Sequence, residues 1–454
     1  MSILTQNTAV NQLKNDVSCF FSKFNVGKLL YKCNSTKEKG ISPIKLLKYK
    51  VENIFNGQSM YMQQKLGSFR EDFSKNSFYR FLSNPKTNWE KFTTALSKKV
   101  ADAIRPLTSE SRVNAFIIDD SLFERTSGKS TELCSKVFDH TTHRYKLGYR
   151  LLTLGWTDGN TFIPVNGTLL ASANDKNITC GSQNFDGRSI AAKRRKRART
   201  KATQVMLEQL KSAMAEGHTA DYVLFDTWFS NPAQLVAVKN LGLDAIGMVK
   251  KSPKIHYEFD GKQMTINEIY SKCKKRRGRS RYLVSVNVIV RKDSEQIPAK
   301  IVCVRNKSNR KDWIAIICTN LDLSEDEIIR IYGKRWQIEV FFKTCKSYLN
   351  LVKECRSLSF DALTAHVATV FVRYMFLALA QRENSDERSL GEIFYIMCQE
   401  LEDIKFSSAL QLLMTAMLES LLDKFVLTKE QLEDYVSEFV NKLPLYIQRA
   451  ILVR

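Results

Sequence analysis

Short apolar runs bounded by turn residues constrain how the middle of this chain can fold. The runs AFIID at 115–119, DYVLFD at 221–226 and DAIGMV at 244–249 have the length and composition of buried strands. Two longer strand-like runs, YRLLTLGW and NTFIPVNGTLL, are joined through turn residues at 157–160. Helical patterns at about 189–215 and 231–241 separate the later strands. This order predicts an α/β fold with a mixed sheet and helices on its faces.

Two of these runs end in an aspartate. Asp119 closes the first run and Asp226 closes the second. Carboxylates from separate strands that meet at one edge of a sheet can hold divalent cations for phosphodiester chemistry. An aspartate at a strand end can also cap a turn or the next helix. Asp120 competes with Asp119, because neighbours on a strand point to opposite faces and only one of the two can reach such a site.

A third acid lies in the segment YGKRWQIEVFFKTCK at 332–346, which we expect to be one helix. Its polar residues at relative offsets of zero, three, seven and fourteen are Tyr332, Arg335, Glu339 and Lys346. At about 100° per residue, these offsets place all four on a stripe roughly 60° wide. An acid for metal and two cations for a phosphodiester suggest a phosphate-handling surface. The alternative is an amphipathic helix with chance charge pairs.

The spacing Y-x2-R-x3-E-x6-K resembles the signature of DDE transposases from bacterial insertion sequences, family four. With Asp119, Asp226 and Glu339 the chain also has the D…D…E order of a ribonuclease-H-like core, and the resemblance covers about 114–346. It implies that these acids are catalytic metal ligands for two Mg²⁺ ions, for which Mn²⁺ can substitute. It also implies that Tyr332, Arg335 and Lys346 position phosphates. The family pattern Asp-x-Ser/Thr favours Asp119 over Asp120.

The resemblance implies a ribonuclease-H-like mixed-sheet core interrupted by a β-rich insertion and flanked by helical regions. We expect a helical DNA-binding domain at 1–108, the first part of the core at 109–249 and the insertion at 250–322. The second part of the core follows at 323–383 and a C-terminal helical region at 384–454. Within the first domain, 74–85 resembles the second helix of a helix-turn-helix, with Arg80 facing outward. A plain surface helix is the alternative.

Trp313 begins DWIAIICT, nineteen residues before Tyr332. Relatives that form DNA hairpins have a Trp before an apolar run in the same place. An indole there can stack an unpaired base, worth about 1–3 kcal/mol. The alternative is a Trp in the core of the insertion.

The chain carries a formal charge of +23, with 70 Lys and Arg against 47 Asp and Glu, which favours a polyanionic partner. Two tracts without acids, at 188–201 and 272–281, fit phosphate contacts, although such runs are usually solvated faces. In the first tract we single out Arg188, Lys193 and Arg194. The basic tracts could also be read as a nuclear import signal, but nothing else in the chain supports that reading.

The apolar run at 362–380 contains His366 and Arg373, which favours a buried core helix over a membrane span. Ten scattered cysteines without C-x-x-C fit free thiols in a reducing cytoplasm.

The resemblance implies a transposase that binds terminal inverted repeats and performs metal-dependent cleavage and strand transfer in cut-and-paste transposition. Its partners would be double-stranded DNA and a second copy of itself in a synaptic complex. It would be cytoplasmic and nucleoid-associated, without a membrane. The alternative function is a non-catalytic DNA-binding protein derived from a transposase. A tyrosine recombinase using Tyr332 is weaker, because we find no Arg-His-Arg constellation.

Overall fold

The computed structural model describes residues 8–383 except 56, 58, 109–111, 126–127, 140–141, 278–279 and 307–311, and also Gln431 and Glu438. Side chains are described from Asp16 onward. The expected C-terminal helical region at 384–454 lies outside the described residues apart from those two. The chain divides into two compact units, one of 1–23, 48–69 and 388–454, and the other of 24–47 and 70–387.

The first hundred residues are helical, as the sequence predicts. The helices are α1 (Thr8–Lys23), α2 (Val26–Lys32), α3 (Pro43–Glu52), α4 (Met60–Lys65), α5 (Lys75–Leu82) and α6 (Trp89–Ile104), followed by the 3₁₀ turn η1 (Arg105–Leu107). In α5 the side chain of Ser74 accepts a hydrogen bond from the backbone N–H of Ser77 at 3.2 Å, which caps the first turn.

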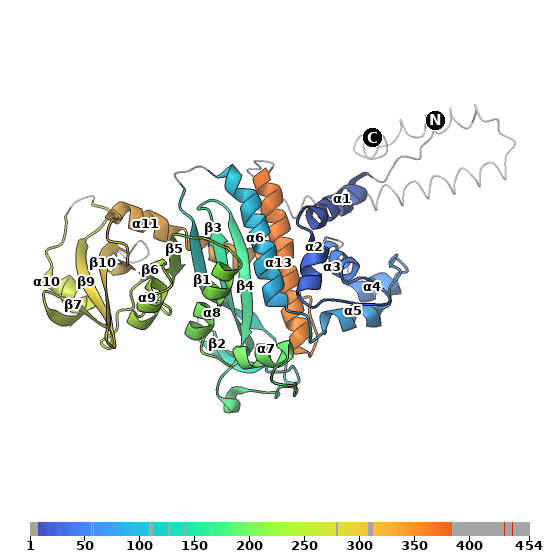
Figure 1. The fold of residues 1–454 in the computed structure, drawn as a ribbon, viewed down its shortest axis with the longest axis horizontal. Coiled ribbons are helices and arrows are strands. Elements are labelled where there is room, and N and C mark those ends of the chain that lie inside the picture. Colours follow the sequence, from blue (N-terminus) through green and yellow to red (C-terminus); the bar gives the residue numbers. More distant parts are fainter. Residues whose placement is uncertain are drawn as a thin grey trace. The chain divides into compact units, whose positions relative to one another are not determined.

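The larger unit contains one long mixed sheet (Figure 1). Its strands are β1 (Ala115–Glu124), β2 (Ser135–Asp139), β3 (Arg144–Thr157), β4 (Phe162–Leu170), β5 (Tyr222–Phe225), β6 (Asp244–Met248), β7 (His256–Phe259), β8 (Lys262–Thr265), β9 (Val284–Lys292), β10 (Glu295–Arg305) and β11 (Trp313–Cys318). The order is β2-β3-β1-β5-β6-β11-β10-β9-β7-β8, with β4 on β3. Strands β1, β5 and β6 are parallel neighbours, whereas β1–β3 and β3–β4 are antiparallel. The expected α/β class with a mixed sheet is confirmed.

The expected β-rich insertion is not a separate sheet. Strand β11 pairs with β6 on one side and with β10 on the other, so the strands after residue 250 extend the sheet of the core. The sequence could not reveal this pairing, because β6 and β11 are separated by more than sixty residues that carry their own hairpins.

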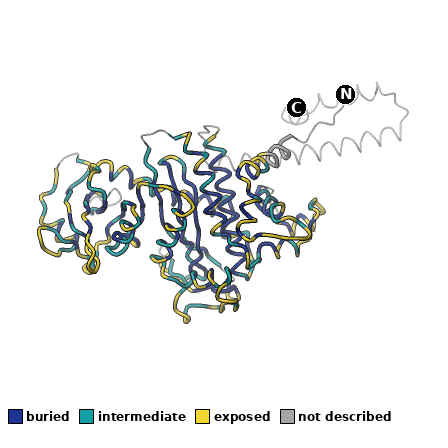
Figure 2. Tube along the Cα trace, in the orientation of Figure 1, coloured by how far each residue is buried: buried dark blue, intermediate teal, exposed yellow. Residues whose placement is uncertain are grey.

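Helices cover this sheet. After η2 (Asp175–Asn177) they are α7 (Ile190–Ala198), α8 (Ala202–Ala215), α9 (Pro232–Lys239), α10 (Ile266–Lys272), α11 (Glu325–Gly333), α12 (Trp336–Ser347) and α13 (Phe360–Glu383). Figure 1 shows α6 and α13 side by side over β4, and both helices contact that strand. The dark blue trace in Figure 2 marks this packed centre. The core therefore lies under the strands that carry the two aspartates.

Helix α13 is apolar on all sides because it is buried on all sides. Within the described part of the chain it is the one helix long and apolar enough to cross a membrane by composition, and its apolar stretch is completely buried in the fold. Its buried His366 and Arg373 have partners: Arg373 Nη1 donates to Glu354 Oε2 at 2.6 Å, and His366 Nε2 lies 2.9 Å from the carbonyl oxygen of Leu351. The predicted core helix is confirmed.

Candidate active site

Asp119 and Asp226 lie beside each other at one point of the sheet. Strands β1 and β5 are parallel, and Ile118 on β1 is the register partner of Phe225 on β5. Asp119 is the next residue of β1, and Asp226 is the first residue after β5, so each aspartate directly follows one member of this pair. Asp119 Oδ1 accepts a hydrogen bond from the N–H of Asp120 at 2.8 Å, and Asp226 Oδ1 accepts one from the N–H of Thr227 at 2.6 Å.

The segment with the third acid is broken into two helices, so the expected single helix is wrong. Helix α11 ends at Gly333 and α12 begins at Trp336, with Arg335 as its N-cap. Between them, the N–H groups of Lys334 and Arg335 donate to carbonyls three residues back, at 2.9 and 3.0 Å. Gly333, a poor helix former, is the local reason for a break at this place. The stripe of four residues therefore does not exist as a continuous helical face.

Arg335 nevertheless joins the acids. Its Nη1 lies 3.2 Å from Asp119 Oδ2, and its Nη2 donates to Glu339 Oε1. One guanidinium thus bridges an acid on β1 and an acid on α12. Glu339 is the more exposed of the two, with 34% of its side chain accessible against 21% for Asp119.

Burial and crowding control the protonation of this cluster. The pKa of Asp119 is raised from 3.8 to about 7, chiefly by burial. The charges of Asp120 and Asp226 contribute to this rise, while Arg335 and the N–H of Asp120 oppose it. Burial also raises the pKa of Tyr332, whose side chain lies within electrostatic range of Arg335, Asp226 and Asp119. Three of the predicted residues, Tyr332, Arg335 and Glu339, are therefore gathered around the two aspartates.

Asp120 points away from this cluster. Its Oδ1 lies 2.5 Å from Arg150 Nη1 on the neighbouring strand β3. Because adjacent strand residues face opposite sides of the sheet, this ion pair accounts for Asp120 and leaves Asp119 on the side of α12.

Lys346 lies farther along the same side of β1. Its Nζ donates to Ser121 Oγ at 2.7 Å. Burial lowers the pKa of Lys346, while Asp139 raises it and Lys146 lowers it through their charges. The ammonium group is therefore partly desolvated two residues beyond Asp119 on β1, and it is separate from the Arg335 cluster.

Asp119, Asp226 and Glu339 offer the carboxylate oxygens that divalent cations prefer, but Arg335 forms ion pairs with Asp119 and Glu339. Among the residues that the structure describes, no three Asp, Glu, His or Cys side chains lie together closely enough to hold a metal ion. Burial raises the pKa of Asp119 even though Arg335 lies 3.2 Å away, and a cation bound beside Asp119 would favour its ionised form. Glu339 is held by Arg335, so the two acids and Glu339 fit such a cation only if this ion pair opens.

A family model described as DDE superfamily endonuclease matches residues 46–311, more than half of the chain. The chain belongs to this family. The family implies DNA as the substrate of a transposase-type nuclease. The match includes Asp119 and Asp226 and ends before Glu339. The comparison with curated proteins gave no match.

Trp313 of the DDE superfamily endonuclease is enclosed by its own chain. The Tyr270 ring stacks on the indole with centroids 4.0 Å apart and an interplanar angle of 14°. The Lys251 ammonium lies 4.0 Å from the indole centroid. Tyr270 therefore covers one face of the half-buried indole, and a base could stack on that face only in its place. The role of Trp313 in base stacking stays a prediction.

An exposed indole lies elsewhere, at a residue that the sequence analysis did not single out. Trp228 is 63% exposed, two residues after Asp226. Its neighbour Phe229 is buried, and the N–H of Phe229 donates to the carbonyl of Asp226 at 3.1 Å, so the turn is anchored. Trp336, the first residue of α12, is also 63% exposed. An Asp-x-Trp sequence directly after a predicted strand was the available signal for Trp228.

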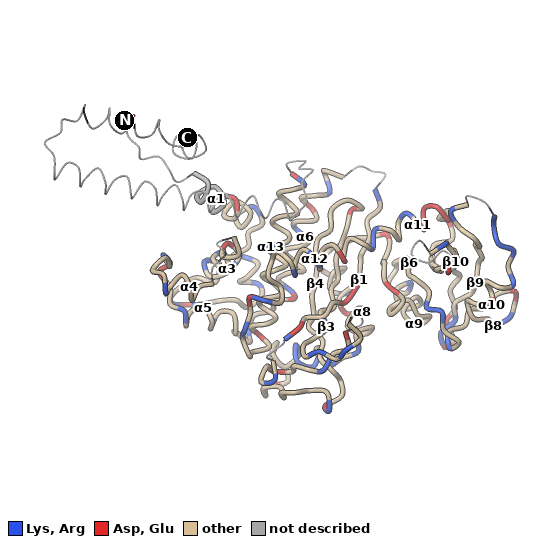
Figure 3. Tube along the Cα trace, turned by 180° about the vertical axis from the view of Figure 1, so that it is seen from behind, with Lys and Arg blue, Asp and Glu red and all other residues tan. Residues whose placement is uncertain are grey.

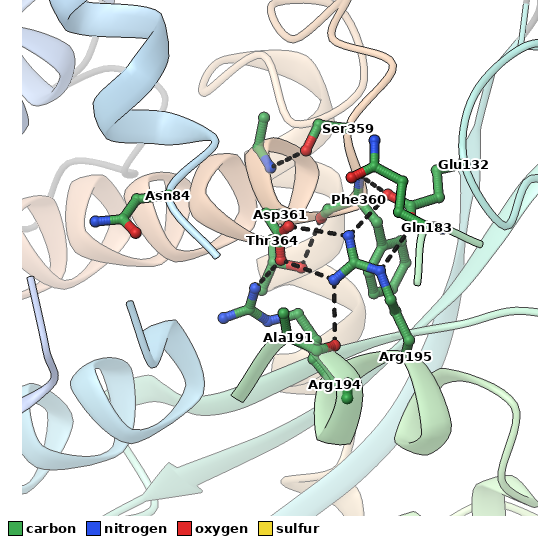
Figure 4. A network of polar contacts seen from close by, with 12 residues as sticks. Asn84, Glu132, Gln183, Ala191, Arg194, Arg195, Ser359, Phe360, Asp361 and Thr364 are labelled. Carbon is green, nitrogen blue, oxygen red and sulfur yellow. Dashed lines mark hydrogen bonds and ion pairs between the residues drawn. The ribbon is translucent and has the colours of Figure 1, made fainter. Parts of the chain in front are cut away.

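The first basic tract is divided between a buried and an exposed face, and Arg194 was wrongly expected to contact DNA. Arg194 is 7% exposed, and its guanidinium donates to Asp361 and to the carbonyl of Thr87. Arg195 likewise pairs with Glu132, at 2.6 Å, and with Asp361, at 2.9 Å (Figure 4). Its interior partners could not be seen from a run of like charges.

The other two singled-out residues of this tract remain accessible. Lys193 is exposed on α7, and 93% of the Arg188 side chain is accessible although it pairs with Asp186 at 3.0 Å. On α5, Phe78, Phe81 and Leu82 are buried as predicted, while Arg80 is exposed. These three cations can reach a phosphate. Blue segments in Figure 3 show that Lys and Arg are spread over the whole sheet, including the strands after residue 250.

Proposed function

We propose that this DDE superfamily endonuclease is the transposase of an insertion sequence, of the family-four type. It would bind terminal inverted repeats, cut them and join the freed 3′ ends to target DNA. One observation carries the proposal: Asp119 and Asp226 follow paired residues on parallel strands, and Arg335 links Asp119 to Glu339 on a helix that follows the sheet. A protein that only bound DNA would not need Asp119 and Asp226 beside each other with Arg335 linking Asp119 to Glu339.

Each residue has a role in this proposal. Asp119, Asp226 and Glu339 would hold two Mg²⁺ ions, or Mn²⁺ in their place. When bound, such ions activate the attacking water or 3′-hydroxyl and stabilise the leaving oxygen. Arg335 holds the acids together before DNA arrives, and its guanidinium suits a bidentate contact with a phosphate once released. Lys346 would contact the same strand as a point charge, and Tyr332 would support Arg335.

The remaining assignments follow from the same chemistry. Coupled cutting of two ends requires two active sites, so we propose a homodimer in the synaptic complex. Arg80, Arg188 and Lys193 would contact DNA phosphates, and we place the protein in the bacterial cytoplasm, associated with the nucleoid. Trp313 would stack a base only after Tyr270 or Lys251 moves away.

Metal dependence tests the proposal. The substrate is the DNA that flanks the gene, in which terminal inverted repeats should bracket the reading frame. Cleavage of labelled ends should require Mg²⁺ or Mn²⁺. Asp226→Ala and Glu339→Ala should abolish cleavage and leave end binding intact in a gel-shift assay. Lys211→Ala, an exposed residue on α8, is the matched surface control.

Two results would contradict the proposal. Cleavage that persists in EDTA would remove the metal mechanism. Specific binding to the ends with no cleavage under any divalent ion would favour the non-catalytic DNA-binding protein.

A further inference from the structure

The strand that carries Asp119 does not stop at the active site. Strand β1 runs on to Glu124, paired with β3 from Asp120↔Leu152 to Glu124↔Gly148. Strand β2 then pairs with the first residues of β3, from Ser135↔Gly148 to Asp139↔Arg144. Three strands therefore form an extension of the sheet beyond Asp119, and β2 is its edge.

A groove runs across this extension. Its lining residues are Lys129, Lys136, Tyr145, Lys146, Leu147 and Thr179. Lys129 and Lys136 are exposed and make no ion pair with the residues that the structure describes. Lys146 is different, because it pairs with Asp139 at 2.9 Å and with Glu124 at 3.3 Å. Two of the three lysines thus present charge to whatever enters the groove.

The groove also displays an aromatic ring. Tyr145 is 71% exposed, although it is a strand residue. The ring of Phe138 on β2 meets it edge-on with centroids 5.3 Å apart, which holds one side of the ring. A large apolar surface left open between cations is the usual make-up of a single-stranded nucleic-acid surface, where bases stack on rings and phosphates lie on lysines.

The groove is connected to the candidate active site by charge. The ammonium of Lys346 interacts electrostatically with Lys146 and Asp139 of the extension. The same ammonium is bonded to Ser121 Oγ at 2.7 Å, two residues from Asp119. Lys346 therefore lies within electrostatic range of Lys146, one of the lysines that line the groove.

We propose that this groove binds an unpaired DNA strand that continues from the cleavage site. Lys129 and Lys136 contact its phosphates, and the Tyr145 ring stacks one unpaired base. The inference rests on the proposed function for the identity of the nucleic acid, but it is tested by binding alone.

The first test measures the salt dependence of binding by the full-length protein, in EDTA, to an end duplex with a five-nucleotide overhang. Each phosphate contact on a single strand contributes about 0.7 to the slope of log K against log salt. The double variant Lys129→Gln/Lys136→Gln should lower that slope by about 1.4, which is roughly 25-fold in affinity at 0.1 M salt relative to 1 M. The control is Lys211→Gln/Lys262→Gln, which removes the same charge from two exposed lysines on α8 and β8.

The second test isolates the ring. Tyr145→Ala should weaken binding of the overhang duplex roughly 5- to 150-fold, the value of one stacked base, and should not affect a blunt duplex. Tyr145→Phe keeps the ring and should bind as the unmodified protein does.

Several outcomes would overturn the inference. If the groove variant and the control lysine variant weakened DNA binding equally, the loss of affinity would come from the change in net charge and not from the groove. Unchanged DNA binding in the groove variants would leave the surface to another occupant, such as an acidic protein segment. Neither outcome bears on cleavage, and loss of cleavage in every preparation would refute the proposed function without affecting these binding results.

Discussion

Replacing Asp119 and Asp120 with Asn should have opposite effects on stability and on activity. Asp119 lies with Arg335 and near Asp226, whereas Asp120 pairs with Arg150 on the other side of β1. Asp119→Asn should therefore remove a metal ligand but also relieve a crowded, buried charge. Asp120→Asn should leave the cleavage site intact and lose only an ion pair.

The magnitudes follow from the surroundings of each side chain. The folded pKa of Asp119 is raised from 3.8 to about 7, so the folded state favours the protonated form and stability falls as pH rises between these values. At about 1.4 kcal/mol per pH unit, ionised Asp119 costs up to about 4 kcal/mol above pH 7. Asp119→Asn should recover part of this at pH 8 and little at pH 4. Asp120→Asn should cost about 1 kcal/mol, the value of a partly exposed pair.

Thermal unfolding in EDTA at pH 4 and pH 8, together with end cleavage in Mg²⁺, measures both effects. The Asp119→Asn protein should unfold at a higher temperature than the unmodified protein at pH 8. It should also cleave at least about 100-fold more slowly, because a bound metal lowers the activation barrier by several kcal/mol. Asp120→Asn should unfold slightly earlier and retain most of its activity. The reverse pattern of activity would make Asp120 the ligand, and a destabilised Asp119→Asn protein at pH 8 would refute the reasoning about crowding.

Two further predictions concern residues away from the acids. Burial lowers the pKa of His218 from 6.5 to about 4, so the protein should lose up to about 3 kcal/mol of stability as pH falls through that window, and pH-dependent urea unfolding of His218→Asn should show a shallower loss. Trp313→Ala should slow nicking and hairpin formation by the same factor, because the indole holds Tyr270 and Lys251, and selective loss of hairpins on denaturing gels would restore a base-stacking role.

The strands that carry the acids could be predicted because their sequences are decisive. AFIID and VLFD are too short and too apolar for anything but buried strands, and a polar residue ends each apolar run. The continuation of β1 to Glu124 was not predicted, because residues 120–124 lack that apolar character. Their strand structure comes from pairing with β3, which is an interaction between distant segments.

The helix with Glu339 shows a different limit. Side-chain spacing assigned Tyr332, Arg335 and Glu339 to one region correctly, but it assumed a continuous helix across Gly333. The break places Arg335 at a helix start, and there its guanidinium reaches β1 as well as Glu339. Sequence spacing describes a helix face only where the backbone stays helical, and glycine weakens that assumption.

In the basic tract, the sequence cannot separate exposed cations from buried ones. Lys193 and Arg194 are neighbours of the same charge, yet one is exposed and the other is paired inside the fold with Asp361. The decisive partner is 167 residues away. Helical spacing could not have identified it, because Asp361 begins a helix on a different part of the fold.

Arg335 reduces the repulsion between the acids of the candidate site, because it pairs with both Asp119 and Glu339. Ionised carboxylates at one place repel each other, and the burial of Asp119 makes that repulsion costly. A guanidinium on the same helix as Glu339 offsets it, and it is attached to the element that must move if the acids are to close around a cation. The guanidinium that pairs with Asp119 and Glu339 is therefore also the group that a substrate phosphate would attract. In this way the proposed site couples arrival of DNA to exposure of Glu339, through a residue that needs no large movement of the sheet.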